Sequence, residues 1–288
     1  MQTIILGIIN GSIYALIALG IALVYSGSRV LNFAQAEIGT LTLYATYAVT
    51  VTHRGPWWLG AIASVAAATG IGLGFERFVV RRMLTASRVT VAVATIGLFS
   101  LMLAIEVQFW SGTIYVLPKP ISSGGFDLAG VFVTWNQLLA IGVVTSIASA
   151  LAVFLRVTDF GLAVKAAADD PVAAQLMGIP RGRVSAFTWG AAGALSAVAV
   201  LMIEPSVGAL APGAFSGLFI GGLTAALVGG LSSLPGAIVG GLAVGVAEAE
   251  VKAHITLSAI PSPNVAAMLV IVLGVLLIRP QGILGRSA

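Results

Sequence analysis

Long apolar runs alternate with short polar stretches along the whole chain. Many of the runs reach the length of about 17–25 residues that an α-helix needs to cross a bilayer. The pattern predicts an all-α, polytopic transmembrane bundle of eight or nine spans, near residues 4–26, 36–52, 57–75, 90–110, 134–155, 184–204, 213–230, 236–250 and 264–279. The second span is weakly marked because Gln35 and Glu37 stand at its start. A re-entrant or broken helix is an alternative there.

One long polar stretch, residues 160–185, interrupts the apolar pattern between two predicted spans. Asp170 is a favourable N-cap, Pro171 would occupy the first helical position, and Gly178 stands where a C-terminal glycine is expected. These signals predict a short capped helix on the membrane surface, within a loop at about 157–183. Such a helix suggests a docking element for a soluble partner protein. We therefore expect a transporter whose energy source lies on another chain.

Composition supports a single transmembrane domain over residues 1–288. Hydrophobic residues make up 59% of the chain, charged residues 8%, and the mean hydropathy is +1.07. A soluble domain carries about 25% charged residues. Cysteine is absent, which excludes disulfides and thiol chemistry. Because the first charged residue is Arg29, we expect the opening apolar run to be a retained span and not a signal peptide.

The distribution of basic residues predicts the orientation, because cytoplasmic loops carry an excess of Lys and Arg. With the N-terminus outside, eleven of the fourteen Lys and Arg residues face inside, most of them in loops 76–89 and 156–183. The inner set is Arg29, Arg77, Arg81, Arg82, Arg88, Arg156, Lys165, Arg181, Arg183, Arg279 and Arg286; the outer set is Arg54, Lys119 and Lys252. The capped helix and the C-terminus are therefore predicted to face the cytoplasm.

Three further segments leave alternatives open. The outer loop from Trp110 to Trp135 is either a plain connector or a docking surface for an extracytoplasmic partner. Residues 229–236 carry Gly-Gly and Pro-Gly pairs, which favour a tight hairpin or the unwound middle of a broken helix. Glycines four residues apart, such as Gly241 and Gly245, allow close helix packing. These glycines fit either a static, tightly packed bundle or an interface at which helices slide during transport.

Polar residues inside spans are candidates for the substrate pathway, because ionisable groups in lipid are costly and usually functional. The candidates are Asn10, Ser12, Asn32, Gln35, Glu37 and Glu106. Interhelical hydrogen bonding is the plainer interpretation of each amide. Glu106 is the deepest carboxyl, whereas Glu37 and Glu204 are expected near the membrane surfaces. Polar side chains beside a helix start would suit a small zwitterion, since helix N-termini favour carboxylates.

The sequence lacks the motifs of several common enzyme and metal-binding chemistries. The chain has no GxxxxGK[ST] sequence, so it hydrolyses no ATP by a P-loop. No HExxH motif, nucleophile elbow or EF-hand pattern occurs either. We therefore expect no enzyme activity, no metal site and no cofactor in this chain. A net charge of +4 reflects basic loops at a membrane face and does not suggest nucleic acid.

Four motifs resemble the LivH-type permeases, the membrane subunits of ABC importers for branched-chain amino acids. They are the opening GSIYALIALGIALVYSGSRVLNFAQAEIG at 11–39, GLAVKAAADDPVAAQLMGIPRGRV at 161–184, GGLSSLPGAIVGG at 229–241 and IRPQGILG at 278–285. They follow one another in family order over nearly the whole chain. The resemblance implies the fold of a type II ABC importer permease.

The resemblance also implies partners and site residues. A second permease subunit, of the same or a sister chain, would pair with this one. Two cytoplasmic ATPases, which bind ATP and Mg²⁺, would drive transport, and an extracytoplasmic binding protein would deliver the substrate. The coupling residues would be Lys165, Asp169, Asp170, Pro171, Gln175 and Gly178. The chain departs from the family pattern at Ala36 and at 43–45, which leaves urea, short amides or another small carboxylated solute as alternative cargo. A stand-alone, ion-coupled secondary transporter is the alternative class.

Overall fold

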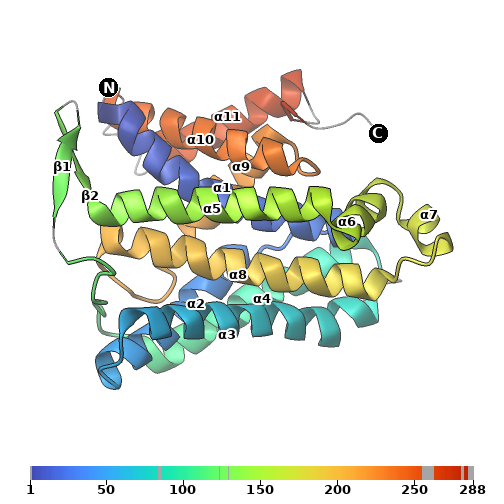
Figure 1. Cartoon of the computed structure of the whole chain (residues 1–288), viewed down its shortest axis with the longest axis horizontal. Helices are drawn as coiled ribbons and strands as arrows, with labels where there is room; N and C mark the ends of the chain where they lie inside the picture. The colour runs from blue at the N-terminus through green and yellow to red at the C-terminus, as the bar shows by residue number, and fades with distance from the viewer. Residues whose placement is uncertain are drawn as a thin grey trace.

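Helices build most of the part of the chain that the structure describes, together with one short β-hairpin (Figure 1). The structure is a computed structural model that describes residues 2–83, 86–122, 124–128, 130–254, 263–279 and 282–284. Its helices are α1 (Gln2–Ser28), α2 (Gln35–Tyr47), the π-helix η1 (Ala48–Thr52), α3 (Trp57–Phe78), the 3-10 helix η2 (Val80–Met83), α4 (Arg88–Trp110), α5 (Trp135–Val157), α6 (Asp159–Asp169), α7 (Pro171–Leu176), α8 (Arg181–Val207), α9 (Gly217–Gly229), α10 (Leu234–His254) and α11 (Pro263–Ile278). The strands are β1 (Gly125–Leu128) and β2 (Val131–Thr134).

Helix α1 is the central element of the bundle. It packs along α10, α8 and α9, and 72% of its most apolar stretch is buried. Only 22% of the corresponding stretch is buried in each of α3, α4 and α5, although these helices are also apolar enough to cross a membrane. Side chains such as Val93, Leu101 and Phe109 on α4 are exposed. Because apolar side chains are stable in lipid, these outer faces suit contact with the membrane or with a second membrane subunit.

Every predicted span corresponds to a helix, but fewer helices are long enough to cross a membrane. Within the described residues, six helices meet that length and composition. Helices α2 and α9 have 13 residues each and α11 has 16. At about 1.5 Å per residue, the 13 residues of α9 rise only about 20 Å, less than the hydrocarbon core, whereas α2 continues directly into η1. The prediction of eight or nine full spans therefore overcounted, since apolar content alone does not reveal helices that stop partway.

The start of α2 lies halfway along α8. The side chain of Gln35 donates a hydrogen bond to the Ala192 carbonyl (2.7 Å), and the Gly39 N–H donates to Ser196 Oγ (3.0 Å). Both acceptors belong to the middle of α8. From there α2 and η1 lead towards Trp110, on which Tyr44 stacks. The expectation of a broken helix in this segment thus agrees with a short α2 that begins inside the bundle.

Helix α9 begins next to the start of α2. Ser216, the residue before α9, donates a hydrogen bond to Glu37 (2.8 Å), and the rings of Phe33 and Phe219 lie 5.5 Å apart. The two short helices therefore meet at their N-termini and lead away from this point. We call α2 and α9 the half-span helices.

The two ends of the bundle differ in structure (Figure 1). One end, which we call the hairpin end, carries β1, β2 and the N-terminus; the opposite end, the α7 end, carries α6 and α7. The basic loops predicted to share one side do meet at the α7 end, where Arg81 donates to the Gly182 carbonyl (3.0 Å). Between α9 and α10 the chain forms the tight hairpin that the glycine pairs predicted, with Ser233 N–H bonded to the Gly230 carbonyl.

Candidate functional site

The capped helix predicted from the sequence is α7. Asp170 is its N-cap, and the carboxylate Oδ1 accepts hydrogen bonds from the N–H groups of Val172 (2.9 Å) and Ala173 (3.0 Å). Pro171 occupies the first turn, where its missing N–H is harmless. The predicted N-terminal signals are confirmed in detail.

The C-terminal end of α7 is closed by a Schellman motif around Gly178. That glycine has φ +84°, a conformation that glycine adopts without steric cost. Its N–H bonds to the Gln175 carbonyl (2.9 Å), and the Ile179 N–H reaches back to Ala174 (3.0 Å). Both ends of α7 are thus fixed by local bonds, which lets so short a helix persist at a surface.

Apolar side chains on α7 face outward. Val172 is 69% exposed, Leu176 84% and Met177 83%. The predicted coupling residues Lys165, Asp169, Asp170, Gln175 and Gly178 are exposed on the same segment. Exposed large apolar side chains rimmed by polar groups are typical of protein interaction sites. The segment has the chemistry of a docking surface, whereas the docking role itself stays a prediction.

Helix α6 was not anticipated from the sequence. Thr158 caps it by accepting a hydrogen bond from the Gly161 N–H (3.0 Å). At its other end the guanidinium of Arg29 donates to the carbonyl of Ala168. This carbonyl belongs to the last turn of α6, where backbone oxygens lack helical donors. Arg29 therefore joins α6 to the segment that links α1 to α2, and nothing in the local sequence around either residue announces the pair.

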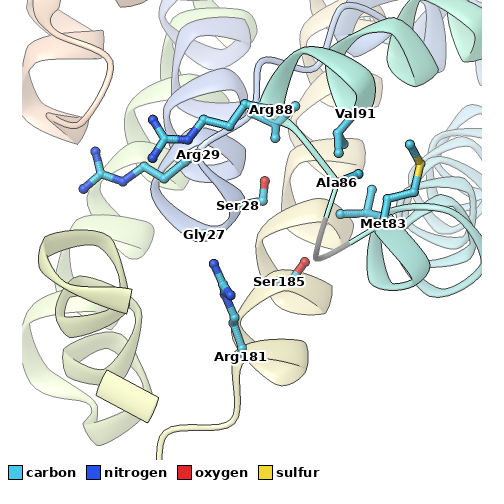
Figure 2. A pocket seen from close by; sticks show the side chains of 11 residues that line it. Gly27, Ser28, Arg29, Met83, Ala86, Arg88, Val91, Arg181 and Ser185 are labelled. Atoms are coloured by element: carbon cyan, nitrogen blue, oxygen red, sulfur yellow. The ribbon is translucent and has the colours of Figure 1, made fainter. Parts of the chain in front are cut away.

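A basic cavity of about 180 Å³ lies at the α7 end, where the end of α1 and the starts of α4 and α8 meet (Figure 2). Arg29, Arg88 and Arg181 line it, together with Ser28 and Ser185. Among the described residues that line it, none carries an acidic side chain. The cavity gathers three of the arginines on which the predicted orientation depends.

The polar candidates at the start of α2 form a connected group. Asn32 donates to the side-chain oxygen of Gln35 (3.0 Å) and accepts from the Ala34 N–H (3.1 Å). Ser196 of α8 donates to the backbone carbonyl of Gln35. These bonds fix the first turn of α2 against α8. Ser196 was not among the predicted site residues, because a serine within an apolar span carries no specific signal.

Glu37 and Glu106 also meet in the bundle interior. Glu37 accepts from Ser216, and Glu106 accepts from the Gly213 N–H (3.0 Å). Both glutamates are fully buried, at 1% and 0% exposed. The expectation that Glu37 lies near a membrane surface is wrong, because α2 begins deep inside the bundle. Glu204, also expected to reach water, is only 3% exposed.

Asn10 and Ser12 do not join this group. The Ser12 hydroxyl is satisfied within its own helix, by the Ile9 carbonyl (2.7 Å). The adjacent Gly11 lies against Leu242 of α10. Among the described residues, neither side chain hydrogen-bonds to the other four pathway candidates. The predicted pathway set therefore separates into one central cluster, made by Asn32, Gln35, Glu37 and Glu106, and two polar positions on α1.

Comparison with known proteins identifies the family of this chain. A family model described as the permease component of the branched-chain amino acid transport system matches residues 3–279. The chain belongs to this permease family. The predicted resemblance is confirmed, as is the all-α ABC importer permease fold, and the relatives are permease subunits of transport systems.

Curated relatives match along nearly their whole length. The high-affinity branched-chain amino acid transport system permease protein LivH of Salmonella typhimurium is 32% identical over 302 residues, which covers 99% of this chain and 96% of that protein. BraD of Pseudomonas aeruginosa is 30% identical with the same coverage. Among solved structures, PsaBC from Streptococcus pneumoniae in complex with Fab aligns with a TM-score of 0.51 at 13% identity. It covers 98% of this chain and 93% of its own, and it shows the fold alone.

Proposed function

We propose that this chain imports branched-chain or related small amino acids across a bacterial inner membrane, as one permease subunit of an ATP-driven complex. Two ATPase subunits, which bind ATP and Mg²⁺, would dock on α7 in the cytoplasm. A second permease subunit would complete the pathway, and a binding protein would deliver substrate at the hairpin end. The observation that carries the proposal is the family match over residues 3–279, which includes the docking segment and both half-span helices.

A continuous chain of contacts supports coupling between α7 and the bundle interior. Helix α7 follows α6 directly, and Arg29 bonds to the last turn of α6. Arg29 opens the segment that ends at Asn32 and Gln35, which hold the start of α2 against α8. A displacement of α7 would therefore be transmitted to the half-span helix α2. For ATP to drive this motion, the ATPase must bind one arrangement of the bundle more tightly than the other.

The cargo follows from the named relatives and from the polarity of the central cluster. Helix N-termini favour a carboxylate, and carboxyl or carbonyl oxygens favour an ammonium group. The meeting point of α2 and α9 places the carboxyl groups of Glu37 and Glu106 beside two helix starts, and a rearrangement that freed these groups would suit a zwitterion with an aliphatic side chain. Urea, short amides and other small carboxylated solutes are the competing cargo for the same permease.

Reconstitution into liposomes tests the proposal. The chain, its sister permease and the two ATPases from the same genome are assembled with ATP inside and the binding protein outside, and uptake of radiolabelled leucine is measured. We expect ATP-dependent uptake that unlabelled isoleucine and valine suppress and urea does not. Full-rate uptake by this chain alone, driven by an ion gradient, would instead establish a secondary transporter.

A further inference from the structure

Two carboxyl groups from different helices meet in the bundle interior, beside the start of α9. Glu37 in the first turn of α2 and Glu106 near the end of α4 both bond to the short segment before α9. Glu37 accepts from Ser216 and Glu106 from the Gly213 N–H, and the two carboxyl groups interact there. Both are fully buried. Among the described residues, no lysine, arginine or histidine forms an ion pair with either of them.

Only one oxygen of each of the two carboxyl groups accepts a hydrogen bond from a described donor. Oε2 of Glu37 accepts from Ser216, and Oε2 of Glu106 accepts from the Gly213 N–H. The other oxygen of each, Oε1, has no protein donor within the described residues. An ionised carboxylate can only accept hydrogen bonds, so two ionised carboxylates cannot bond to each other. Two such charges in contact within a low-dielectric interior also repel strongly, and one shared proton removes both difficulties.

A third polar group faces the same place. The hydroxyl of Tyr44 is buried and has no partner among the described residues, and it interacts electrostatically with both glutamates. Its ring is fixed by stacking on Trp110, with the centroids 4.3 Å apart, and by an edge contact with Tyr115. A neutral hydroxyl held beside the pair stabilises one negative charge.

We propose that Glu37 and Glu106 bind one proton between them, so that the pair carries a single negative charge and holds α2 to α4 and to the segment 213–216. This site lies where the half-span helices meet. The inference concerns the protonation and packing of the resting chain, and it does not depend on which solute the protein transports.

Infrared spectroscopy of the purified chain tests the shared proton directly. A protonated carboxyl group has a C=O stretch separate from the carboxylate bands. In Glu37→Gln the new amide donates to the remaining carboxylate, and in Glu106→Gln the roles reverse, so neither variant needs the proton. We expect each variant to lose the protonated-carboxyl band of the pair at neutral pH. The double variant should lose no more than either single variant.

Glu204→Gln is the matched control, since Glu204 is a buried glutamate outside the pair. Its spectral change should simply add to that of Glu106→Gln. The melting temperature of each variant verifies folding: Glu37→Gln and Glu106→Gln should stay near wild type, and Glu106→Ala should fall below both. If one single variant keeps the band, the proton belongs to one carboxyl alone and the shared site is refuted. If neither variant changes the band, the pair holds no proton.

Discussion

At the scale of single residues, Gln35 shows how an isolated polar side chain can fix a helix start within an apolar bundle. Its amide donates to Ala192 of α8 and accepts from Asn32, and it is completely buried. The amide occupies the space beside Gly20 of α1, where a side chain would collide with it. One residue thus bonds α2 to α8 and packs against α1.

Replacing Gln35 with alanine should destabilise the bundle. The change removes two buried hydrogen bonds and leaves a small void, which together cost about 1–3 kcal/mol. Unfolding of the purified chain in detergent measures the effect. Gln175→Ala, at an exposed position of α7, is the control and should shift the free energy of unfolding by no more than about 0.5 kcal/mol. Equal stability of the two variants would contradict the structural role of Gln35.

At the scale of elements, α7 depends on its caps because a helix of six residues has little stability of its own. Asp170→Ala removes the acceptor of two backbone N–H groups, a loss of about 0.5–2 kcal/mol that falls on this helix alone. Amide exchange over residues 171–178 should quicken and ATP-driven uptake should fall, while the melting temperature of the bundle is retained.

Two substitutions sharpen the test of α7. Asp170→Ser keeps a capping oxygen and should restore slow exchange and uptake. Asp169→Ala removes a neighbouring acidic charge that caps no helix. It should leave amide exchange over residues 171–178 unchanged, and any loss of uptake should be smaller than for Asp170→Ala. If Asp169→Ala impairs uptake as strongly as Asp170→Ala, charge and not helix capping controls docking.

The contact between Arg29 and α6 is the second element-scale device, since it links a surface helix to the half-span helix α2. Arg29→Ala should lower ATP-driven uptake by about fivefold or more, the range of ordinary coupling energies, with the ATPase subunits still bound. Arg82→Ala removes an exposed positive charge at the same end of the bundle and serves as the control. Uptake and complex assembly are measured on the same liposomes. Similar uptake by the two variants would show that Arg29 is not in the coupling path.

At the scale of the whole molecule, the sequence predicted what local chemistry determines. The order of the long helices, the caps of α7 and the tight 229–236 turn followed from apolar runs and from Asp, Pro and Gly positions. The sequence did not predict how deep in the bundle α2 begins, because Gln35 bonds to Ala192, a residue far away in the sequence. The same holds for Glu37, whose burial results from α4 and the segment before α9. The family motif at 278–285 lies partly outside the described residues, as does Arg286.

The predicted orientation in the membrane rests on the distribution of Lys and Arg, and cysteine labelling tests it directly. The structure places the basic loops at the α7 end but contains no membrane. A single cysteine in place of exposed Gln175 should react with a membrane-impermeant maleimide only after cells are broken. A cysteine in place of exposed Leu128 on β1 should react in intact spheroplasts. The opposite pattern would reverse the orientation.

Close glycine contacts between α1 and α10 are what allow the most buried helix to lie at the centre of the bundle. A Cβ atom at Gly245 would come within 2.3 Å of the Gly11 backbone, and one at Gly241 within 2.6 Å of Ala15. In lipid, where apolar burial adds little between helices, such backbone contact supplies much of the packing energy.

Gly245→Ala must push α1 and α10 apart, because the colliding atoms are backbone and cannot rotate away. Overpacking of this kind costs about 1–3 kcal/mol, so the melting temperature of the purified chain should fall. Gly70→Ala on α3 has open space around the new methyl group and should be neutral or slightly stabilising, since alanine is the better helix former. A static bundle predicts that Gly245→Ala loses stability and uptake together. If uptake alone fails while the melting temperature is retained, the α1–α10 interface must slide during transport.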